Sequence, residues 1–135
     1  MDLSGTVVAV GSNCSRIRVG DKVWADVGGV TTDTGAMAQY AVLEEEQVGL
    51  APSSLSPIEA GTIPLVGLTS LEMWQKIWAA YPKGPTANLT VVVTSGSGGT
   101  GFISIQLAKR AYLAGTVITS TSGDENNREI TVKYL

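Results

Sequence analysis

The feature that most constrains this chain is a glycine-rich turn between a strand-like run and a helical pattern. Residues 96–101 read Gly-Ser-Gly-Gly-Thr-Gly and follow the β-branched run 89–94. Beyond them, apolar residues recur at a helical period from about Gly101 to Tyr112. A Gly-x-Gly-x-x-Gly turn in this setting is typical of the first strand and helix of a parallel sheet that binds a dinucleotide. The alternative is an ordinary glycine-rich turn that carries no ligand.

Each glycine of the pattern has a separate predicted role. Gly96 permits the tight bend, Gly98 lets the backbone approach a pyrophosphate, and Gly101 lets the helix pack close to the strand. The first-turn amides, at the positive end of the helix dipole, then face the phosphates. A P-loop instead carries Lys and then Ser or Thr directly after its last glycine, whereas Phe102 and Ile103 stand there in this chain. A nicotinamide or flavin dinucleotide is therefore favoured over a nucleoside triphosphate.

The end of the second predicted strand favours NADPH over NADH. That strand spans residues 116–121, and no acid stands at its end, where a dehydrogenase selective for NAD usually binds the ribose 2′-hydroxyl. The hydroxyls of Ser120 and Ser122 leave room for a 2′-phosphate and can hydrogen-bond it, while a carboxylate would repel it. The alternative is that both serines merely end a strand and that Asp124 is the ribose acid.

Composition indicates a globular chain with a core. Of its 135 residues, 44% are hydrophobic and 16% are charged, and the net charge is −3. Without a basic cluster we expect a small-molecule substrate as partner, and neither nucleic acid nor a membrane. Residues 1–4 have neither the basic start nor the apolar core of a signal peptide. We expect a cytoplasmic protein, with an organellar location open if a targeting segment precedes Met1.

The numbers of cysteine and histidine residues limit which disulfides, metal sites and general bases the chain can have. Cys14 is the single cysteine, so the chain has no internal disulfide and no cysteine-cluster metal site. Histidine is absent, which removes the commonest general base and the commonest zinc ligand. We therefore predict no metal site in this chain.

The two halves of the chain have different patterns. Strands are predicted at residues 6–10, 22–27 and 37–43, separated by turn residues, and 44–46 is predicted to be a solvated acidic turn. This part is typical of a piece of a barrel or sandwich.

A helical region follows. Ser56-Pro57-Ile58-Glu59 has capping-box spacing with Pro at the first helical position. Apolar residues then recur close to a helical period, and residues 81–85 end the pattern. Trp74 and Trp78 stand one turn apart and are predicted to be core residues rather than a stacking surface for a ligand.

Five segments, in order, resemble the medium-chain dehydrogenase/reductase superfamily, and within it the zinc-independent quinone oxidoreductase-like branch. They are residues 2–11, 19–24, 35–40, 58–70 and 96–109. The resemblance implies an α/β chain with a partial GroES-like β domain at residues 1–55. The first half of a Rossmann domain, a doubly wound parallel nucleotide-binding fold, follows at residues 56–135.

The resemblance also implies a set of cofactor-binding residues. They are Thr69, Gly96, Ser97, Gly98, Gly99, Thr100, Gly101, Ser120 and Ser122. Residues 97–100 would line the pyrophosphate, Ser122 would lie at the adenosine ribose or its phosphate, and Thr69 near the nicotinamide. For Thr69 an ordinary place inside a helix is an equal alternative. Asp2 falls where zinc-using relatives carry the Glu of a Gly-His-Glu sequence, and the resemblance to the zinc-free branch implies no metal ligands.

The chain also departs from the superfamily pattern. The resemblance implies an N-terminal part of the β domain, further Rossmann strands and a C-terminal return to the β domain, so we expect a chain truncated at both ends. Residues 124–135 do not resemble the superfamily's next helix. Asn126 stands where NADPH-using relatives often carry a basic residue.

These observations predict an NADPH-dependent reductase of quinones or α,β-unsaturated carbonyls as the parent protein. Hydride transfer depends on proximity and orientation, so it needs no side-chain nucleophile, and no catalytic residue is assigned. Tyr40 is interpreted as structural. Two alternatives stay open. One is a catalytically inactive truncated product that retains at most dinucleotide binding or an interaction role, and the other is a flavin-binding module. A homodimeric parent is also open.

Overall fold

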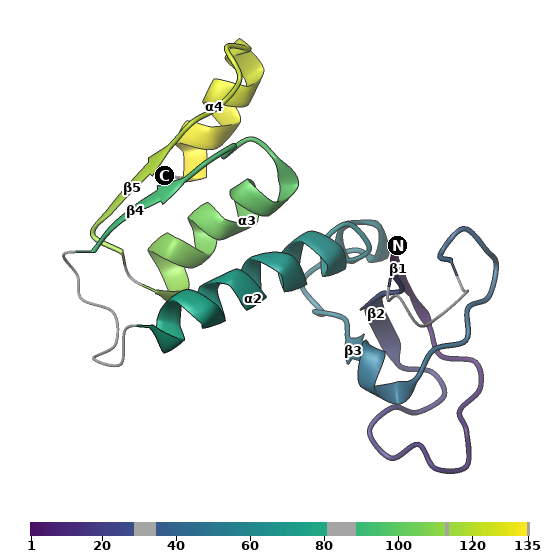
Figure 1. Cartoon of the computed structure of the whole chain (residues 1–135). Coiled ribbons are helices and arrows are strands. Elements are labelled where there is room, and N and C mark those ends of the chain that lie inside the picture. The colour runs from purple at the N-terminus through teal and green to yellow at the C-terminus, as the bar shows by residue number, and fades with distance from the viewer. Residues whose placement is uncertain (29–34, 81–88, 113, 135) are drawn as a thin grey trace. The chain divides into compact units, whose positions relative to one another are not determined.

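The computed structural model describes residues 1–28, 35–80, 89–112 and 114–134 (Figure 1). The chain forms two compact units, Met1–Leu65 and Val66–Leu135. The domain boundary after residue 55 stays a prediction. Within the described residues, no helix combines the length and the hydropathy needed to cross a membrane.

Unit 1 is built on a small antiparallel sheet with the order β1-β2-β3. Its strands are β1 (Asp2–Thr6), β2 (Lys22–Asp26) and β3 (Val48–Leu50). Alternate residues of β2 point into the unit, so Val23 and Ala25 are buried while Lys22 is exposed. Ile17 and Val27 complete the buried apolar set of this unit.

Two of the three strands predicted for this half differ from the structure. The strand predicted at residues 6–10 is β1 instead, which lies earlier and ends at Thr6. Residues 37–43, predicted as a strand, are mostly exposed and form none. An alternating pattern becomes a strand only where a neighbouring strand offers hydrogen bonds. Among the described residues, the sheet contains β1, β2 and β3, and residues 37–43 pair with none of them.

The acidic run at residues 44–46 is not simply solvated. It leads into a short 3₁₀ helix, Glu45–Gln47. The Glu45 carboxylate accepts hydrogen bonds from the amides of Ser15, Arg16 and Ile17, at 3.0, 2.6 and 3.0 Å. These bonds, that of Arg16 first, hold the pKa of Glu45 below its ordinary value. The prediction of a solvated turn is therefore wrong for Glu45.

The predicted capping box is confirmed at the start of α1 (Pro57–Ala60). The Ser56 hydroxyl accepts from the Glu59 amide at 3.3 Å, and the Glu59 carboxylate accepts from the Ser56 amide at 2.8 Å. The Ser56 hydroxyl also donates to that carboxylate at 2.7 Å, and these bonds lower the pKa of Glu59. The helix is short because the chain turns at Gly61 before the next helix begins.

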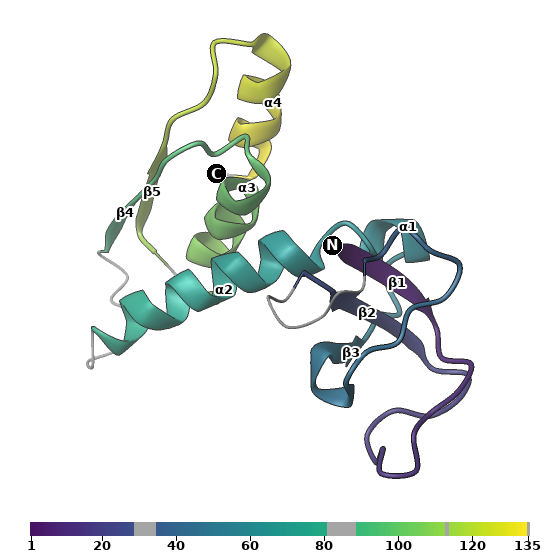
Figure 2. The same cartoon turned by 45° about the vertical axis from the view of Figure 1, so that its right-hand side comes forward.

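Unit 2 contains a strand–helix–strand arrangement with a parallel pair of strands (Figure 2). Its elements are α2 (Pro64–Ala79), β4 (Thr90–Val93), α3 (Gly99–Gln106), a π-helical turn (Leu107–Ala111), β5 (Thr116–Thr119) and α4 (Glu125–Tyr134). Strands β4 and β5 pair residue by residue from Thr90 with Thr116 to Val93 with Thr119. Helix α3 packs against β4 and α4.

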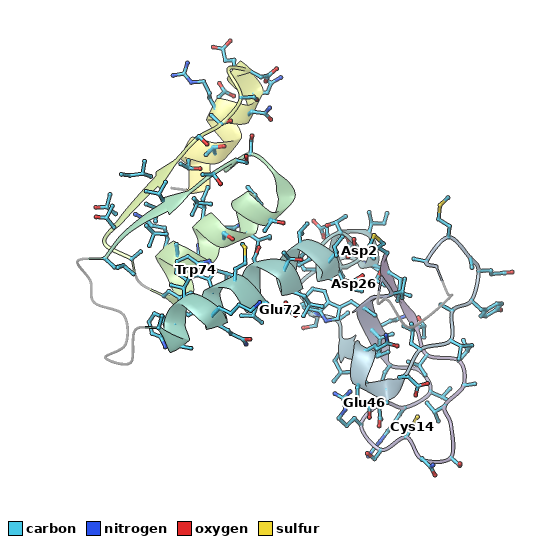
Figure 3. All side chains as sticks on the ribbon, in the orientation of Figure 1. Asp2, Cys14, Asp26, Glu46, Glu72 and Trp74 are labelled. Carbon is cyan, nitrogen blue, oxygen red and sulfur yellow. The ribbon has the colours of Figure 1, made fainter. Side chains whose placement is uncertain are left out.

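An aromatic cluster forms the core of unit 2. Trp74, labelled in Figure 3, is 2% exposed and packs with the buried Ala108 and Ala114. Its ring stacks on that of Tyr112, with centroids 4.7 Å apart and planes inclined by 11°. Trp78 also contacts Tyr112, at 4.9 Å between centroids. The prediction that Trp74 is a core residue is confirmed, and Trp78 is half-buried.

The predicted elements of this half differ from the structure mainly at their ends. The helix predicted from about Gly101 begins at Gly99, and the strand predicted to reach residue 121 ends at Thr119. The end predicted for α2 at residues 81–85 lies outside the described residues. Residues 125–134 form helix α4, although their sequence does not resemble the superfamily's next helix.

Candidate functional site

The glycine-rich turn connects β4 to α3, and its left-handed residue is Ser95. Ser95 has φ 55°, which is uncommon outside glycine, and its carbonyl accepts from the Gly98 amide at 2.9 Å. The Ser95 amide donates to the Ser120 hydroxyl at 3.1 Å, which ties the bend to the end of β5. The positive φ of the bend therefore lies at Ser95, one residue before Gly96, to which the sequence assigned the tight bend.

Gly96 is a glycine because β5 lies directly against it. A Cβ at this position would stand 2.2 Å from Oγ1 of Thr119 and 2.9 Å from Cδ1 of Ile105. The Gly96 amide donates to the Ser120 carbonyl at 2.7 Å. Its lack of a side chain therefore permits close packing between the turn and the second strand.

Gly101 has the predicted role of bringing helix and strand together. A Cβ there would lie 2.1 Å from the Ser95 carbonyl oxygen and 2.8 Å from the Ser95 carbonyl carbon. Both atoms belong to the backbone, so they cannot rotate away as a side chain can. Only glycine lets the first turn of α3 stand this close to the end of β4.

The two glycines between them lie nearer the surface. A Cβ on Gly98 would be 3.2 Å from the Ser95 oxygen, and one on Gly99 would be 2.9 Å from Cγ1 of Val66. Both residues are exposed. These contacts are internal, so the approach of a pyrophosphate to Gly98 stays a prediction.

The start of α3 has the features of an anion site. Its N-cap is Gly98, which has no side chain, and no side-chain cap hydrogen bond is formed there. The first amides of a helix have no partner within the helix, and the helix dipole places partial positive charge at them. Because the turn carries no carboxylate to occupy this position, an external anion can bind the first-turn amides.

The remaining predicted residues lie around this turn to different degrees. Ser97 and Thr100 are half-buried within it. Ser120 joins it through the hydrogen bonds to Ser95 and Gly96. Ser122 is exposed, and its hydroxyl accepts from Nδ2 of Asn127 at 2.7 Å. Thr69 is an exposed residue of α2.

The acid considered as a ribose ligand has a local partner. One carboxylate oxygen of Asp124 accepts from the Asn127 amide at 3.3 Å, and the Asp124 carbonyl accepts from the Arg128 amide at 3.1 Å. Asp124 therefore caps the first turn of α4. This geometry leaves the choice between the two nicotinamide dinucleotides open.

A cavity of about 520 Å³ adjoins the turn. It is lined by Met73, Trp74 and Ile77 of α2, by residues 91–95, and by residues 98–101 and Ser104 of α3 and its N-cap. Consecutive residues of a strand point to opposite faces, so a cavity lined by 91–94 runs along the edge of β4 that β5 does not occupy. Its walls are largely apolar, and the helix start supplies polar amides at one end.

Another cavity, of about 770 Å³, lies in unit 1. None of the predicted site residues lines it. In the part of the chain that the structure describes, no group of three or more His, Cys, Asp or Glu side chains is arranged to hold a metal ion.

Sequence reasoning missed the residues that support the turn from α2. Ser70 is fully buried, and its hydroxyl donates toward the Thr100 carbonyl at 2.9 Å. Val66 lies against Gly99. The signal available in the sequence was their spacing of one helical turn, which places both on one face of α2.

Comparison with known proteins agrees with both halves of the fold. Residues 1–53 match the alcohol dehydrogenase GroES-like domain family. A 2-methylene-furan-3-one reductase from Solanum lycopersicum is 35% identical over 125 residues, which is 90% of this chain and 31% of that protein. A chloroplastic quinone-oxidoreductase homolog from Spinacia oleracea is 34% identical over 125 residues, which is 93% of this chain and 36% of that protein. The chain thus spans about a third of the length of these relatives.

Solved structures show the same likeness. An alcohol dehydrogenase superfamily protein from Novosphingobium aromaticivorans superposes with a TM-score of 0.79 at 34% identity, over 96% of this chain and 38% of that one. A mycobacterial protein solved with NADPH gives 0.76 at 27% identity, over 98% of this chain and 38% of that one. The predicted fold class, a GroES-like β segment followed by Rossmann elements, is confirmed. By sequence and by fold the chain is therefore similar to members of the medium-chain dehydrogenase/reductase superfamily, among them proteins named quinone oxidoreductases.

Proposed function

We propose that this chain forms the NADPH-binding part of a zinc-independent oxidoreductase that transfers hydride to a quinone or an α,β-unsaturated carbonyl compound. The observation that carries the proposal is the start of α3. Its first-turn amides have no side-chain cap, and Gly101 holds them close to the end of β4. Relatives named as a quinone-oxidoreductase homolog and a 2-methylene-furan-3-one reductase support this substrate class.

The residues present fit a dinucleotide. Residues 97–100 would line the pyrophosphate, with the first-turn amides of α3 as donors, and the largely apolar wall that includes Trp74 would lie beside the bound cofactor. The nicotinamide, when bound, supplies the hydride. This chain's contribution is to fix the position and orientation of that ring, which by itself accounts for a large part of such a rate acceleration.

NADPH is proposed as the cofactor, ahead of NADH. The hydroxyls of Ser120 and Ser122 stand at the end of β5, where no carboxylate opposes a 2′-phosphate. Asn127, bonded to Ser122, and the exposed Arg128 on the same helix are the nearest groups that could assist. A structural neighbour solved with NADPH supports this choice.

The proposal that the enzyme is zinc-independent rests on the residue types of this chain. The chain has no histidine and a single, exposed cysteine, so the usual nitrogen and sulfur ligands of zinc are lacking. We also propose a small-molecule substrate and no nucleic acid or membrane partner. A cytoplasmic or organellar location and a homodimeric parent stay predictions.

The second candidate function is dinucleotide binding or protein interaction without catalysis. One observation favours it: Val92 and Ile118, neighbours on β4 and β5, are 66% and 51% exposed. An apolar sheet face of this kind is typical of a surface that another polypeptide covers. The two candidates differ in turnover, not in NADPH affinity.

Titration of the full chain with NADPH, followed by calorimetry, tests the first proposal. We expect saturable binding, weakened at least about tenfold by Gly98→Val, because the branched side chain stands over the first-turn amides. Gly5→Val is the matched control, since Gly5 is an exposed strand residue with no atom within 4 Å of its Cβ position. A wild-type chain that binds neither NADPH nor NADH contradicts the proposal.

Turnover separates the two candidates. Oxidation of NADPH by 1,4-benzoquinone or by an enone, followed at the nicotinamide absorbance, is expected of the oxidoreductase. Saturable NADPH binding without oxidation by either compound favours the non-catalytic candidate instead.

A further inference from the structure

A buried hydroxyl joins two helices of unit 2. Ser70 on α2 is 0% exposed. Its Oγ lies 2.7 Å from the carbonyl oxygen of Val66, one turn earlier in the same helix, and 2.9 Å from that of Thr100 in α3. The single hydroxyl hydrogen is shared between these two acceptors. It links α2 to the first turn of α3.

The residue one turn before Ser70 contacts the same turn. Cγ1 of Val66 lies 2.9 Å from the position that a Cβ on Gly99 would occupy, so the valine side chain rests against the Gly99 backbone. Residues four apart on a helix share a face. Helix α2 therefore holds the start of α3 at two neighbouring points, one apolar and one polar.

Peptide geometry shows what the polar contact controls. The carbonyl of Thr100 and the amide of Gly101 belong to one planar peptide group, and they point in opposite directions. A hydroxyl that fixes this carbonyl also fixes the direction of the Gly101 amide. That amide is one of the orphan donors at the helix start.

Burial alone does not explain this hydrogen bond. Ser104, one turn after Thr100 in α3, is 3% exposed, yet its hydroxyl has no partner among the described residues. Of these two buried serines, only Ser70 has hydrogen-bond acceptors for its hydroxyl among the described residues.

We propose that Ser70 is a positioning residue for the dinucleotide site. Its hydroxyl holds the peptide between Thr100 and Gly101, and so directs the Gly101 amide, one of the first-turn amides of α3 that face the pyrophosphate. The inference rests on the proposed function, because it concerns the same site. Ser70 touches no part of the ligand and acts through Thr100.

The test compares Ser70→Ala with Ser104→Ala in the full chain. Ser70→Ala leaves both carbonyls with their helical amide donors, so it removes the link without leaving an unpaired group. We expect NADPH affinity to fall about fivefold, the usual effect of losing one buried hydrogen bond. Ser104→Ala removes a hydroxyl that has no partner among the described residues, although Ser104 lines the cavity beside the turn. Because no hydrogen bond is lost, we expect a much smaller change in affinity than in Ser70→Ala.

Amide hydrogen exchange in the absence of ligand gives a second measurement. We expect faster exchange at Gly101 in Ser70→Ala, with unchanged exchange at residues 91–93 of β4. A purely structural role would instead lower the unfolding midpoint and leave the affinity of the folded protein unchanged.

The outcomes separate this inference from the proposed function. Wild-type affinity in Ser70→Ala, or an equal loss in both alanine variants, overturns the role of Ser70 while the dinucleotide site stands. Failure of the wild type to bind NADPH overturns the site itself. If Ser70→Ala does not fold, Ser70→Cys keeps the volume with a weaker donor. It is then expected to bind NADPH less tightly than the wild type, and equal binding contradicts the inference.

Discussion

At the scale of single residues, the turn is defined by how closely backbone atoms approach one another. Gly101 excludes any side chain because the opposing atoms are the carbonyl carbon and oxygen of Ser95. A Cβ on Gly96 would stand 2.2 Å from Oγ1 of Thr119, an atom that belongs to a side chain. The requirement for glycine is therefore stricter at Gly101, where no rotamer change can relieve the clash.

A second residue-scale feature is the carboxylate of Glu45. It accepts three consecutive amides from the segment before β2, and these bonds favour its ionised form. A carboxyl whose pKa is lowered by folding stabilises the folded chain above the pKa of the unfolded chain. The stabilisation is lost as pH falls through the folded pKa. For Glu45 this window lies below the ordinary value of 4.5.

Glu45→Gln should therefore destabilise unit 1 at pH 7 and reduce its sensitivity to acid. The neutral amide loses the charge-assisted part of the three hydrogen bonds. Amide exchange at Arg16 and Ile17, measured at pH 7 and pH 4, reports the change locally. Glu46→Gln is the control, because Glu46 is exposed and, like Glu45, lies just before β3. Equal protection in both variants at pH 7 would contradict this assignment.

Which residues could be predicted from sequence depends on how local their interactions are. The capping box of Ser56 and Glu59 spans four residues, so spacing alone revealed it. The Ser95 amide bonds to the hydroxyl of Ser120, just after β5, and the buried hydroxyl of Ser70 bonds to the Thr100 carbonyl of α3. These partners lie 25 and 30 residues away in sequence, and no short pattern records them.

At the scale of elements, the aromatic core of unit 2 joins α2 to the π-helical turn that follows α3 and to Tyr112. The π-helical turn Leu107–Ala111 ends with a bond from the Tyr112 amide to the Leu107 carbonyl at 2.9 Å. The ring of Tyr112 then lies against both Trp74 and Trp78. Aromatic contact of this kind contributes beyond the apolar area that it buries.

Tyr112→Ala should destabilise unit 2 by about 2 kcal/mol, because it removes both ring contacts from a half-buried position. Urea unfolding followed by tryptophan fluorescence measures the change. Tyr112→Phe keeps the ring and is expected to stay within about 0.5 kcal/mol of the wild type. Tyr40→Ala is a further control, since Tyr40 is 69% exposed. A loss in Tyr112→Phe as large as that in Tyr112→Ala would exclude the rings as the cause.

The sequence predicted best those elements whose packing partners are their neighbours along the chain. Strands β4 and β5 and helix α3 follow one another and pack together, so local pattern and tertiary contact agree. Residues 37–43 have the alternation of a strand but form none in the structure. Alternation specifies which face would be buried, but only a neighbouring strand satisfies the backbone.

At the scale of the whole molecule, unit 2 leaves an apolar sheet surface uncovered among the described residues. The parallel pair β4 and β5 carries Val92 and Ile118 on its exposed face. Two strands are few for a parallel sheet, which is usually covered on both faces. This surface is the main physical reason to expect the chain to associate with other polypeptide.

The double variant Val92→Thr, Ile118→Thr tests that expectation. Threonine keeps the β-branched shape while replacing a methyl group by a hydroxyl, so we expect the same secondary structure. Sedimentation velocity should show less self-association than in the wild type at equal concentration. Thr90 and Thr116 already occupy the same face, which shows that the strands accept hydroxyls there. Identical sedimentation of both proteins would remove this face as the cause of association.

The aromatic cluster has a consequence for how the chain is made. Trp74 leaves the ribosome well before Ala108, Tyr112 and Ala114, the residues that bury it. Strand β4 likewise waits for its partner, because each residue of β5 from Thr116 to Thr119 follows the β4 residue that it pairs with by 26 positions. During synthesis, helix α2 therefore exposes its indole rings to solvent or to a chaperone, and the nascent chain is most prone to misassembly until the second strand emerges.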